Sequence, residues 1–388
     1  MKNRTFERRS RPFNRLVPGR RDTTVKDDDQ HSYQGSMPRS TAALREWHAR
    51  FPAEHALEPG LPIVDAHHHL YGEAADTQHY RIQDLKRDAA GGHSIIGTVY
   101  VEAYRWAWRQ TGPEALRPVG EVEWIVGRTP MPAAAGIRQL GAGIVSSADL
   151  TLGAGVSEVL DALLEAGQGR LRGVRHLAAY DDGLVGSFIK HRPPPQLLMD
   201  PAFRRGFAEL QVRGLSFDAW IYHHQIAELI DLADAFPQTR IVLDHVGGVI
   251  GVGEFRSQRS TVFARWKDDL RSLAARPNVV VKIGGMGMPV FGFGFEHHAR
   301  PATSAELAQA WGPFIDACIE AFGPHRCMFE SNFPVDKQSC GYTELWNAFK
   351  LATRSLSPKE RQDLFYRSAC RTYRLPELEA AGDHAIAA

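Results

Sequence analysis

Several features that would define a class of protein are missing from this chain. Its four cysteines (Cys318, Cys327, Cys340 and Cys370) form no C-x-x-C pair, so the sequence predicts neither a disulfide framework nor a zinc knuckle. No apolar run approaches the ~20 residues of a membrane-spanning helix, and the N-terminus lacks the apolar stretch of a secretory signal. Because 46 basic residues almost cancel 45 acidic ones, neither nucleic acid nor an anionic membrane is expected as a partner. These absences favour a reducing, cytoplasmic location.

Residues 1–40 contain few apolar side chains. Arginines alternate with polar residues and are followed by Asp27-Asp28-Asp29. Such a segment buries too little surface to offset the entropy of ordering it, so we predict a disordered tail. Binding of an acidic partner is the alternative interpretation of this charge pattern.

From residue 61 onward, short apolar runs alternate with amphipathic segments. The runs are mostly continuous, without strict alternation, as is typical of parallel strands buried on both faces. Strand followed by helix, eight times over, predicts an α/β fold with a single (β/α)₈ (TIM) barrel over residues 41–378 and a flexible C-terminus over 379–388. An open, doubly wound sheet is the alternative. The eight runs are Ile63–Ala66, Thr98–Val101, Gly143–Val145, Gly173–Arg175, Phe217–Tyr222, Ile241–Asp244, Val279–Ile283 and Cys327–Phe329.

Three of the segments that follow strands are unusually long: Tyr104–Arg117, Ala178–Leu198 and Gly284–Arg300. In a barrel, the carboxyl ends of the strands form the rim where active sites lie, and long loops there are often functional. Trp106 and Met286 in these loops predict an apolar wall for a partly apolar or ring-bearing small-molecule substrate. The alternative is that such aromatic side chains close the rim or form an oligomer contact, which is compatible with a homodimer.

The strongest local signal is the sequence from Ile63 to Leu70, which contains three consecutive histidines. Alternate side chains of an extended strand point to the same side, so His67 and His69 should point together, with His68 turned away. Two imidazoles that converge at a strand end can bind a divalent metal. A solvated or capping run of histidines is the alternative.

Polar side chains also end other predicted strands. On the barrel assumption the carboxyl ends of all eight strands meet at one rim, so these side chains should converge on one site. They are Glu102, Arg175, His176, Tyr222, His223, His224, His245, Lys282, Glu330 and Asn332.

Six segments resemble, in order, the amidohydrolase family 2 of metal-dependent hydrolases. They read IVDAHHHLY, TVYVEA, GVRH, IVLDHVGG, VVVKIGG and RCMFESNFPVD, and the likeness extends from about residue 61 to 375. This family includes sugar lactonases, pyrone-dicarboxylate lactonase and nonoxidative decarboxylases, and the chain is most similar to its lactonase-like branch. The resemblance implies a barrel hydrolase with a divalent metal, most often zinc.

The resemblance also implies roles for individual residues. His67, His69 and His223 would be metal ligands, with His224 as the competing choice for the third. His245 would bind substrate or move protons. Arg175 would face a substrate carboxylate or carbonyl, since a guanidinium suits planar oxyanions. The remaining substrate-binding candidates are Glu102, His176, Tyr222 and Lys282, together with Trp106 and Met286 from the loops.

One position departs from the family pattern. The family has Ser-Asp-Trp-Pro after the last strand, whereas this chain has Ser331-Asn332-Phe333-Pro334. An amide cannot accept a proton as a carboxylate does, so Asn332 leaves both the metal and the general base open. Glu330, Asp336 and His245 are the candidates for the base, and a site that works without metal is the alternative.

These observations predict a hydrolase that opens a lactone, or cleaves a related ester or amide carbonyl, by attack of water. A metal-bound water with a pKa near ~7 would be the nucleophile if a divalent ion is present. Two other functions remain open: a nonoxidative decarboxylase or other C–C lyase on the same scaffold, and a non-catalytic binding protein with a degenerate site.

Overall fold

The computed structural model describes residues 33–103, 105–130 and 137–387. Most of the predicted N-terminal tail lies outside these ranges. Within them, no helix combines the length and apolar character needed to cross a membrane. All four cysteines are buried and free, in agreement with the prediction that the chain has no disulfide framework.

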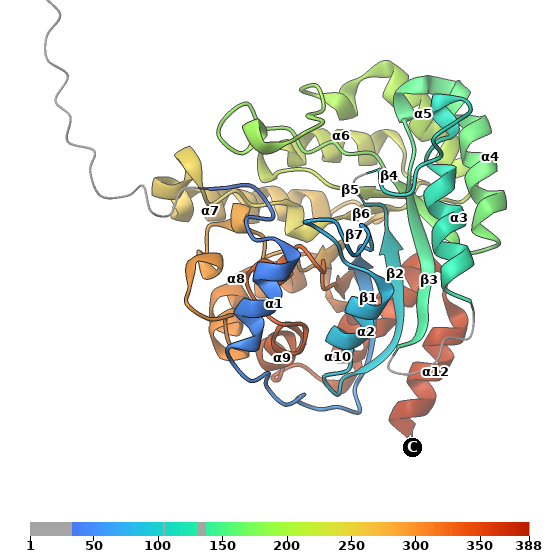
Figure 1. The fold of residues 1–388 in the computed structure, drawn as a ribbon. Helices are drawn as coiled ribbons and strands as arrows, with labels where there is room; N and C mark the ends of the chain where they lie inside the picture. Colours follow the sequence, from blue (N-terminus) through green and yellow to red (C-terminus); the bar gives the residue numbers. More distant parts are fainter. Residues whose placement is uncertain (1–32, 104, 131–136, 388) are drawn as a thin grey trace, which may run out of the picture. The chain divides into compact units, whose positions relative to one another are not determined.

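Eight parallel strands follow one another in chain order within a single sheet (Figure 1). Beyond the last strand, the Asn332 N–H donates to the His67 carbonyl and the His69 N–H donates to the Phe333 carbonyl, both at 2.8 Å. These bonds join the end of the sheet to its beginning, so it is nearly closed into a barrel and the predicted fold class is confirmed. The strands are β1 Pro62–His68, β2 Ser94–Val101, β3 Ile137–Ser147, β4 Leu171–Arg175, β5 Ser216–Ala219, β6 Ile241–Leu243, β7 Val279–Ile283 and β8 Cys327–Phe329.

Helices connect the strands and lie outside the sheet (Figure 1). Their amphipathic pattern explains this position: the helix over Val156–Gly167 buries its apolar side at Val156, Val159, Leu160 and Leu163. The connecting helices are α2 Ile82–Ala89, α3 Val119–Arg128, α4 Val156–Gly167, α5 Pro201–Val212, α6 Ile226–Ala235, α7 Arg259–Ala274 and α8 Ser304–Phe322. Outside the strand series lie α1 Thr41–Ala49, α9 Tyr342–Ala352, α10 Pro358–Gln362, α11 Ser368–Tyr373 and α12 Pro376–Ala387, the last over most of the stretch predicted to be flexible.

The interior of the barrel contains its own apolar cluster. Val64, Val242 and Val280 from the strands pack there with Tyr373 and Leu378 from the C-terminal helices. The approach of α12 is close, because a Cβ placed on Gly97 of β2 would lie 2.2 Å from Cδ1 of Leu378. The C-terminal segment thus contributes to the barrel interior as well as to its outer surface.

A layer of charged side chains lies directly beyond this apolar layer. Since strand side chains alternate, Asp244 points to the same side as Val242, and Lys282 to the same side as Val280. Glu330 follows Met328 of the interior cluster in the same way. All three charged side chains are fully buried, which is costly unless they are paired. The alternation of side chains along the strands therefore places a layer of buried charged side chains at the carboxyl ends of the strands.

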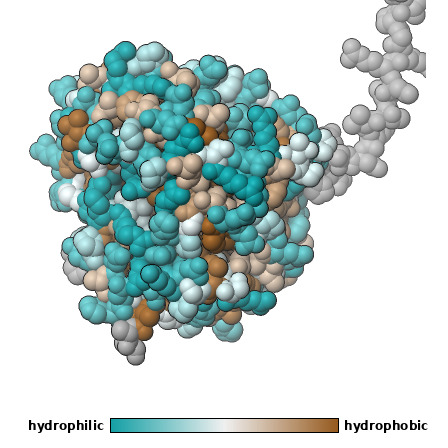
Figure 2. Space-filling view, turned by 180° about the vertical axis from the view of Figure 1, so that it is seen from behind, coloured by the Kyte–Doolittle hydropathy of each residue, from teal (hydrophilic) through white to brown (hydrophobic). Residues whose placement is uncertain are grey.

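The face of the protein seen in Figure 2 is mostly hydrophilic. Its hydrophobic side chains lie in small groups separated by hydrophilic ones. Broad contiguous apolar patches mark docking surfaces for proteins or membranes, and this face does not show one.

Stability should depend on His93, a buried histidine that directly precedes β2. Burial, and then the charge of Lys350, lower the pKa of His93 from 6.5 to about 4. Below pH 6.5 the unfolded chain therefore binds a proton that the folded chain does not bind. The free energy of unfolding should fall by at most about 3 kcal/mol as the pH falls from 6.5 to 4 because of this group. Urea unfolding across this range should show a shallower loss for His93→Asn than for the wild type.

The matched control is His55→Asn, which changes an exposed histidine. This control should follow the wild-type curve. Equal pH slopes for His93→Asn and the wild type would contradict the prediction.

Candidate active site

His67 and His69 converge as the alternation of β1 predicts. Their Nε2 atoms lie 3.1 Å apart and both rings are buried. His68 turns away and bonds Oγ1 of Thr98 at 2.8 Å. The extended backbone at the end of β1 therefore separates a converging pair of imidazoles from a histidine with a structural contact.

The hydrogen bonds of His69 fix its tautomer. Its Nδ1 lies 3.0 Å from the carbonyl oxygens of both Val101 and Glu102. A carbonyl only accepts, so Nδ1 carries the proton and Nε2 directs a lone pair towards His67. Burial, and then the charge of Arg175, hold the pKa of His69 well below its ordinary value, so this ring is neutral at physiological pH.

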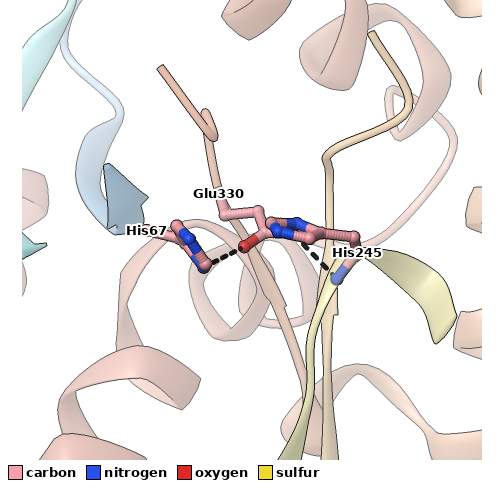
Figure 3. Close-up of side chains that lie close together, drawn as sticks. All are labelled: His67, His245 and Glu330. Atoms are coloured by element: carbon pink, nitrogen blue, oxygen red, sulfur yellow. Dashed lines mark hydrogen bonds and ion pairs between the residues drawn. The ribbon is translucent and has the colours of Figure 1, made fainter. Parts of the chain in front are cut away.

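Glu330 and His245 form the central pair of the site (Figure 3). Oε1 of Glu330 accepts from Nδ1 of His245 at 2.7 Å and from its backbone N–H at 3.1 Å. Burial alone would raise the pKa of Glu330, but the contact with His245 is the largest opposing effect, and the pKa is lowered to about 2. The ionised carboxylate therefore holds the proton of His245 on Nδ1, which leaves Nε2 with a free lone pair. Oε2 of Glu330 lies 3.1 Å from Nδ1 of His67.

An unusual backbone presents His245 to its partner. His245 and Val246 both have positive φ (53° and 48°), a conformation that costs a non-glycine residue about 1–2 kcal/mol. Gly285, which follows β7, packs against the ring: a Cβ there would lie 2.5 Å from Cγ of His245. The glycine after β7 and the strained turn after β6 thus fix the direction of the imidazole.

Arg175 brings a fixed positive charge from the end of β4. Its guanidinium binds Oε1 of Glu102 through Nε (2.8 Å) and Nη2 (2.6 Å), and Nη1 lies 3.4 Å from Nε2 of His67. Burial would lower the pKa of Arg175, but the carboxylates of Glu102 and Asp244 outweigh it and raise it. Glu102 therefore orients a permanent cation against the histidine pair.

Lys282 places a second cation on the other side of His67. Its Nζ lies 3.1 Å from Nδ1 of His67, 2.7 Å from Oδ2 of Asp218 and 3.1 Å from Oδ1 of Asp244. Burial would lower the pKa of Lys282, but Asp218 and Asp244 outweigh it and raise it, so the amine stays charged. Burial and the charge of Lys282 hold the pKa of His67 well below its ordinary value. His67 is therefore neutral and receives a proton donor at Nδ1.

The donor atoms also fit a divalent metal ion. His67, His245 and Glu330 each offer one ligand atom, and these atoms lie within 4.8 Å of one another. Oε2 of Glu330 is buried and lacks a hydrogen-bond partner in the described part of the chain. Two imidazole nitrogens and a carboxylate oxygen form a donor set that Zn²⁺ accepts, although the charges of Lys282 and Arg175 would weaken its binding.

Two of the predicted metal ligands lie outside this cluster of described residues. His69 contacts His67 but is not one of the three clustered ligands. His223 instead accepts a hydrogen bond at Nδ1 from the Ile250 N–H (3.3 Å) and packs against the ring of Phe255. His224, the competing choice, is exposed and bonds the carbonyl of Tyr180.

Asn332 and Asp336 connect loops instead of joining the central pair. Nδ2 of Asn332 donates to Oδ1 of Asp336 at 2.8 Å. The other carboxylate oxygen of Asp336, Oδ2, accepts from the Gly287 N–H at 2.9 Å. Burial raises the pKa of Asp336 well above its ordinary value. These contacts join the segment after β8 to the segment after β7.

The other predicted substrate-binding residues differ in their burial and contacts. His176 accepts from the Leu150 N–H through Nδ1 and packs on Phe203, which gives it a structural contact. Tyr222 and Met286 are buried, while Trp106 is half-buried and packs against the apolar core.

Sequence reasoning missed four residues that contact the site. Asp218 and Asp244 pair with Lys282, and Tyr373 of α11 donates its hydroxyl to Asp218 at 2.6 Å. Trp220, just beyond β5, packs edge to face on His245 with ring centroids 4.8 Å apart. The signal for the two aspartates is an acidic side chain inside an apolar run, whereas no strand end marks Tyr373.

The arrangement as a whole can activate water and stabilise a developing negative charge on oxygen. Glu330 and His245 form a carboxylate–imidazole pair with a free nitrogen, and Arg175 and Lys282 supply fixed positive charge in a buried setting. Nearby neutral imidazoles add further donors and acceptors.

Comparison with known proteins shows a family model and two relatives that match this chain. The family model described as "Amidohydrolase" matches residues 64–375. Protein y4mH of Sinorhizobium fredii is 29% identical over 326 residues, which cover 81% of this chain and 99% of that protein. An L-fucono-1,5-lactonase of Burkholderia multivorans is 32% identical over 209 residues, which cover 54% of this chain and 64% of the lactonase.

Solved structures agree with this result. An amidohydrolase of Burkholderia multivorans has been solved with bound HEPES (TM-score 0.61) and with bound zinc (TM-score 0.59). Each of these structures is 26% identical to the chain and covers 81% of it and 99% of the solved chain. With the matched region extending from β1 to the end of α11, the chain belongs to the amidohydrolase family.

Proposed function

We propose that the protein hydrolyses the cyclic ester of a small hydroxy acid, with a six-membered sugar lactone as the substrate class. The likeness to L-fucono-1,5-lactonase supports the substrate, although the alignment covers 64% of that enzyme. The observation that carries the proposal is the 2.7 Å bond between Glu330 and Nδ1 of His245, next to Arg175 and His67. This combination supplies a base and a positive field beside one carbonyl.

The proton transfers follow from the tautomers. Nε2 of His245 takes a proton from water while the water oxygen attacks the lactone carbonyl carbon, and Glu330 stabilises the resulting imidazolium. Negative charge that develops on the carbonyl oxygen is stabilised by Arg175. When the bond between the carbonyl carbon and the ring oxygen breaks, His245 returns the proton to that oxygen. The product is an open-chain hydroxy acid, which ionises to its carboxylate.

While His245 holds a divalent ion, it would have no free lone pair with which to act as the base, so the route above applies to the site without an ion. His67, His245 and Glu330 are the residues that would hold such an ion, with zinc the most suitable by donor type. When bound, the ion would supply Lewis-acid polarisation of the carbonyl.

Trp220 supports a ring-shaped substrate. It is half-buried, and its ring packs on His245 and on Tyr222. A flat aromatic surface beside the base suits the apolar C–H face of a pyranose-like ring.

A substrate panel should identify the reaction. Five- and six-membered aldonolactones, an acyclic methyl ester and hydroxybenzoates would be incubated with the protein, and acid release or CO₂ release would be measured. We expect acid release from the six-membered lactones well above the spontaneous rate. The double variant His67→Ala/His69→Ala should lose this activity and keep its circular dichroism spectrum.

Two outcomes would overturn the proposal. CO₂ release from hydroxybenzoates without lactone hydrolysis would assign a decarboxylase to the same scaffold. Unchanged lactone hydrolysis in the double variant would show that the reaction takes place elsewhere.

A further inference from the structure

A cavity of about 420 Å³ opens at the amino-terminal ends of the strands. Its lining includes Arg240 and Arg326, which directly precede β6 and β8, and Pro277, which precedes β7. Because the strands are parallel, this end is opposite to the end that carries His245 and Glu330. From Arg240 to His245 the chain advances five residues, roughly 16 Å in an extended strand. The cavity is therefore separate from the candidate active site.

The positive charge of this cavity is only partly compensated. Arg371 binds Oδ1 of Asp363 at 2.9 Å. Arg240 and Arg326, by contrast, have no ion pair with a carboxylate in the described ranges, and burial and then the charge of Arg326 lower the pKa of Arg240. Two guanidinium groups that repel each other across a cavity would both be stabilised by an anion between them.

The two arginines differ in how firmly they are held. Arg326 donates to the carbonyls of Phe322, Arg276, Val279 and Ala274, so its guanidinium is fixed before any ligand arrives. Arg240 makes one such bond, to Pro277 at 3.3 Å, and most of its five N–H donors remain available. Arg326 thus offers a fixed positive charge, and Arg240 offers N–H donors that are free to bind a ligand. This arrangement suits a planar or tetrahedral oxyanion.

Part of the remaining wall of the cavity is apolar, and His325 and Thr372 also line the cavity. Ala274, Pro277 and Val280 belong to the apolar part of the wall. A volume of this size is within the range of about 300–1,000 Å³ typical of small-molecule sites. A ligand that contacts both the arginines and the apolar part of the wall must therefore combine a negatively charged group with a short apolar group.

We propose that this cavity binds a small organic oxyanion, a carboxylate or phosphate monoester that carries a short apolar group. The oxyanion lies between Arg240 and Arg326, and the apolar group lies on the wall formed by Ala274, Pro277 and Val280. The site does not depend on the reaction proposed above, and it is a second, peripheral ligand site of the protein.

Isothermal titration calorimetry with three probes tests the proposal: phenyl phosphate, benzoate and inorganic phosphate. We expect phenyl phosphate or benzoate to bind at millimolar concentration, and inorganic phosphate to bind more weakly than phenyl phosphate. Which organic probe binds better separates a phosphate ester from a carboxylate ligand. In Arg240→Ala the dissociation constant should rise about tenfold, the effect of one lost charge-assisted contact.

The matched control is Arg205→Ala, which removes the same charge from an exposed position in α5. This variant should bind the organic probes like the wild type. The double variant His67→Ala/His69→Ala should also bind them unchanged, which separates this site from the catalytic one. Absence of binding in the wild type, an equal loss in Arg205→Ala, or inorganic phosphate binding as tightly as phenyl phosphate would each overturn the proposal.

Discussion

Replacing Glu330 with glutamine should lower kcat by about 10²–10⁴-fold, because the base His245 would lose the carboxylate that stabilises its protonated form. The carboxylate accepts the Nδ1 proton of His245 and stabilises the imidazolium that forms when Nε2 takes a proton from water. A neutral amide keeps the shape of the side chain but cannot stabilise that charge. Steady-state kinetics on the lactone identified by the panel would measure the loss, with circular dichroism as the check that the variant is folded.

Asp336→Asn is the comparison variant, because the sequence also predicts Asp336 as a candidate base. Asp336 is as deeply buried as Glu330, but its oxygens accept from Asn332 and the Gly287 N–H. We expect a much smaller effect on kcat for this variant. A loss as large as that of Glu330→Gln, or wild-type kcat in Glu330→Gln, would contradict the assignment of Glu330.

The barrel could be predicted because its strands are continuous apolar runs separated by amphipathic helices. Boundaries were less predictable: the run expected at Gly143–Val145 lies in the second half of the longer strand β3. The run expected at Phe217–Tyr222 ends at Ala219 as a strand, so simple alternation does not extend to His223. Alternation holds only while the backbone is extended, which is why His67 and His69 converge and His223 lies apart from the cluster.

The members of the site that end strands were predictable, and those that lie elsewhere were not. Arg175, His245 and Glu330 follow apolar runs directly, so they are expected to meet at the rim formed by the carboxyl ends of the strands. Tyr373 reaches Asp218 from a C-terminal helix, and its position depends on how that helix enters the barrel. Long-range packing of this kind leaves no periodic signal in the sequence.

Lys282→Met should lower the free energy of unfolding by about 3–5 kcal/mol, the cost of leaving a buried ion pair without one partner. Lys282 is fully buried, and its Nζ lies 2.7 Å from Asp218 and 3.1 Å from Asp244. Methionine fills a similar volume, so the loss reflects charge more than packing. Urea unfolding at neutral pH would measure it, and the double variant Lys282→Met/Asp218→Asn should recover part of the loss because one carboxylate is removed.

Lys350→Met separates this effect from the loss of any buried lysine. Lys350 is also buried, but its Nζ donates to the carbonyls of Leu57 and Glu58 and contacts Nδ1 of His93. Its removal leaves carbonyls unbonded and no ionised carboxylate, so the expected loss is smaller, about 1–3 kcal/mol. If both lysine variants lose the same stability, or the double variant recovers none, the carboxylates beside Lys282 do not carry the charge that this geometry requires. A larger loss for Lys282 would instead show that the layer holding His67 in place is ionic.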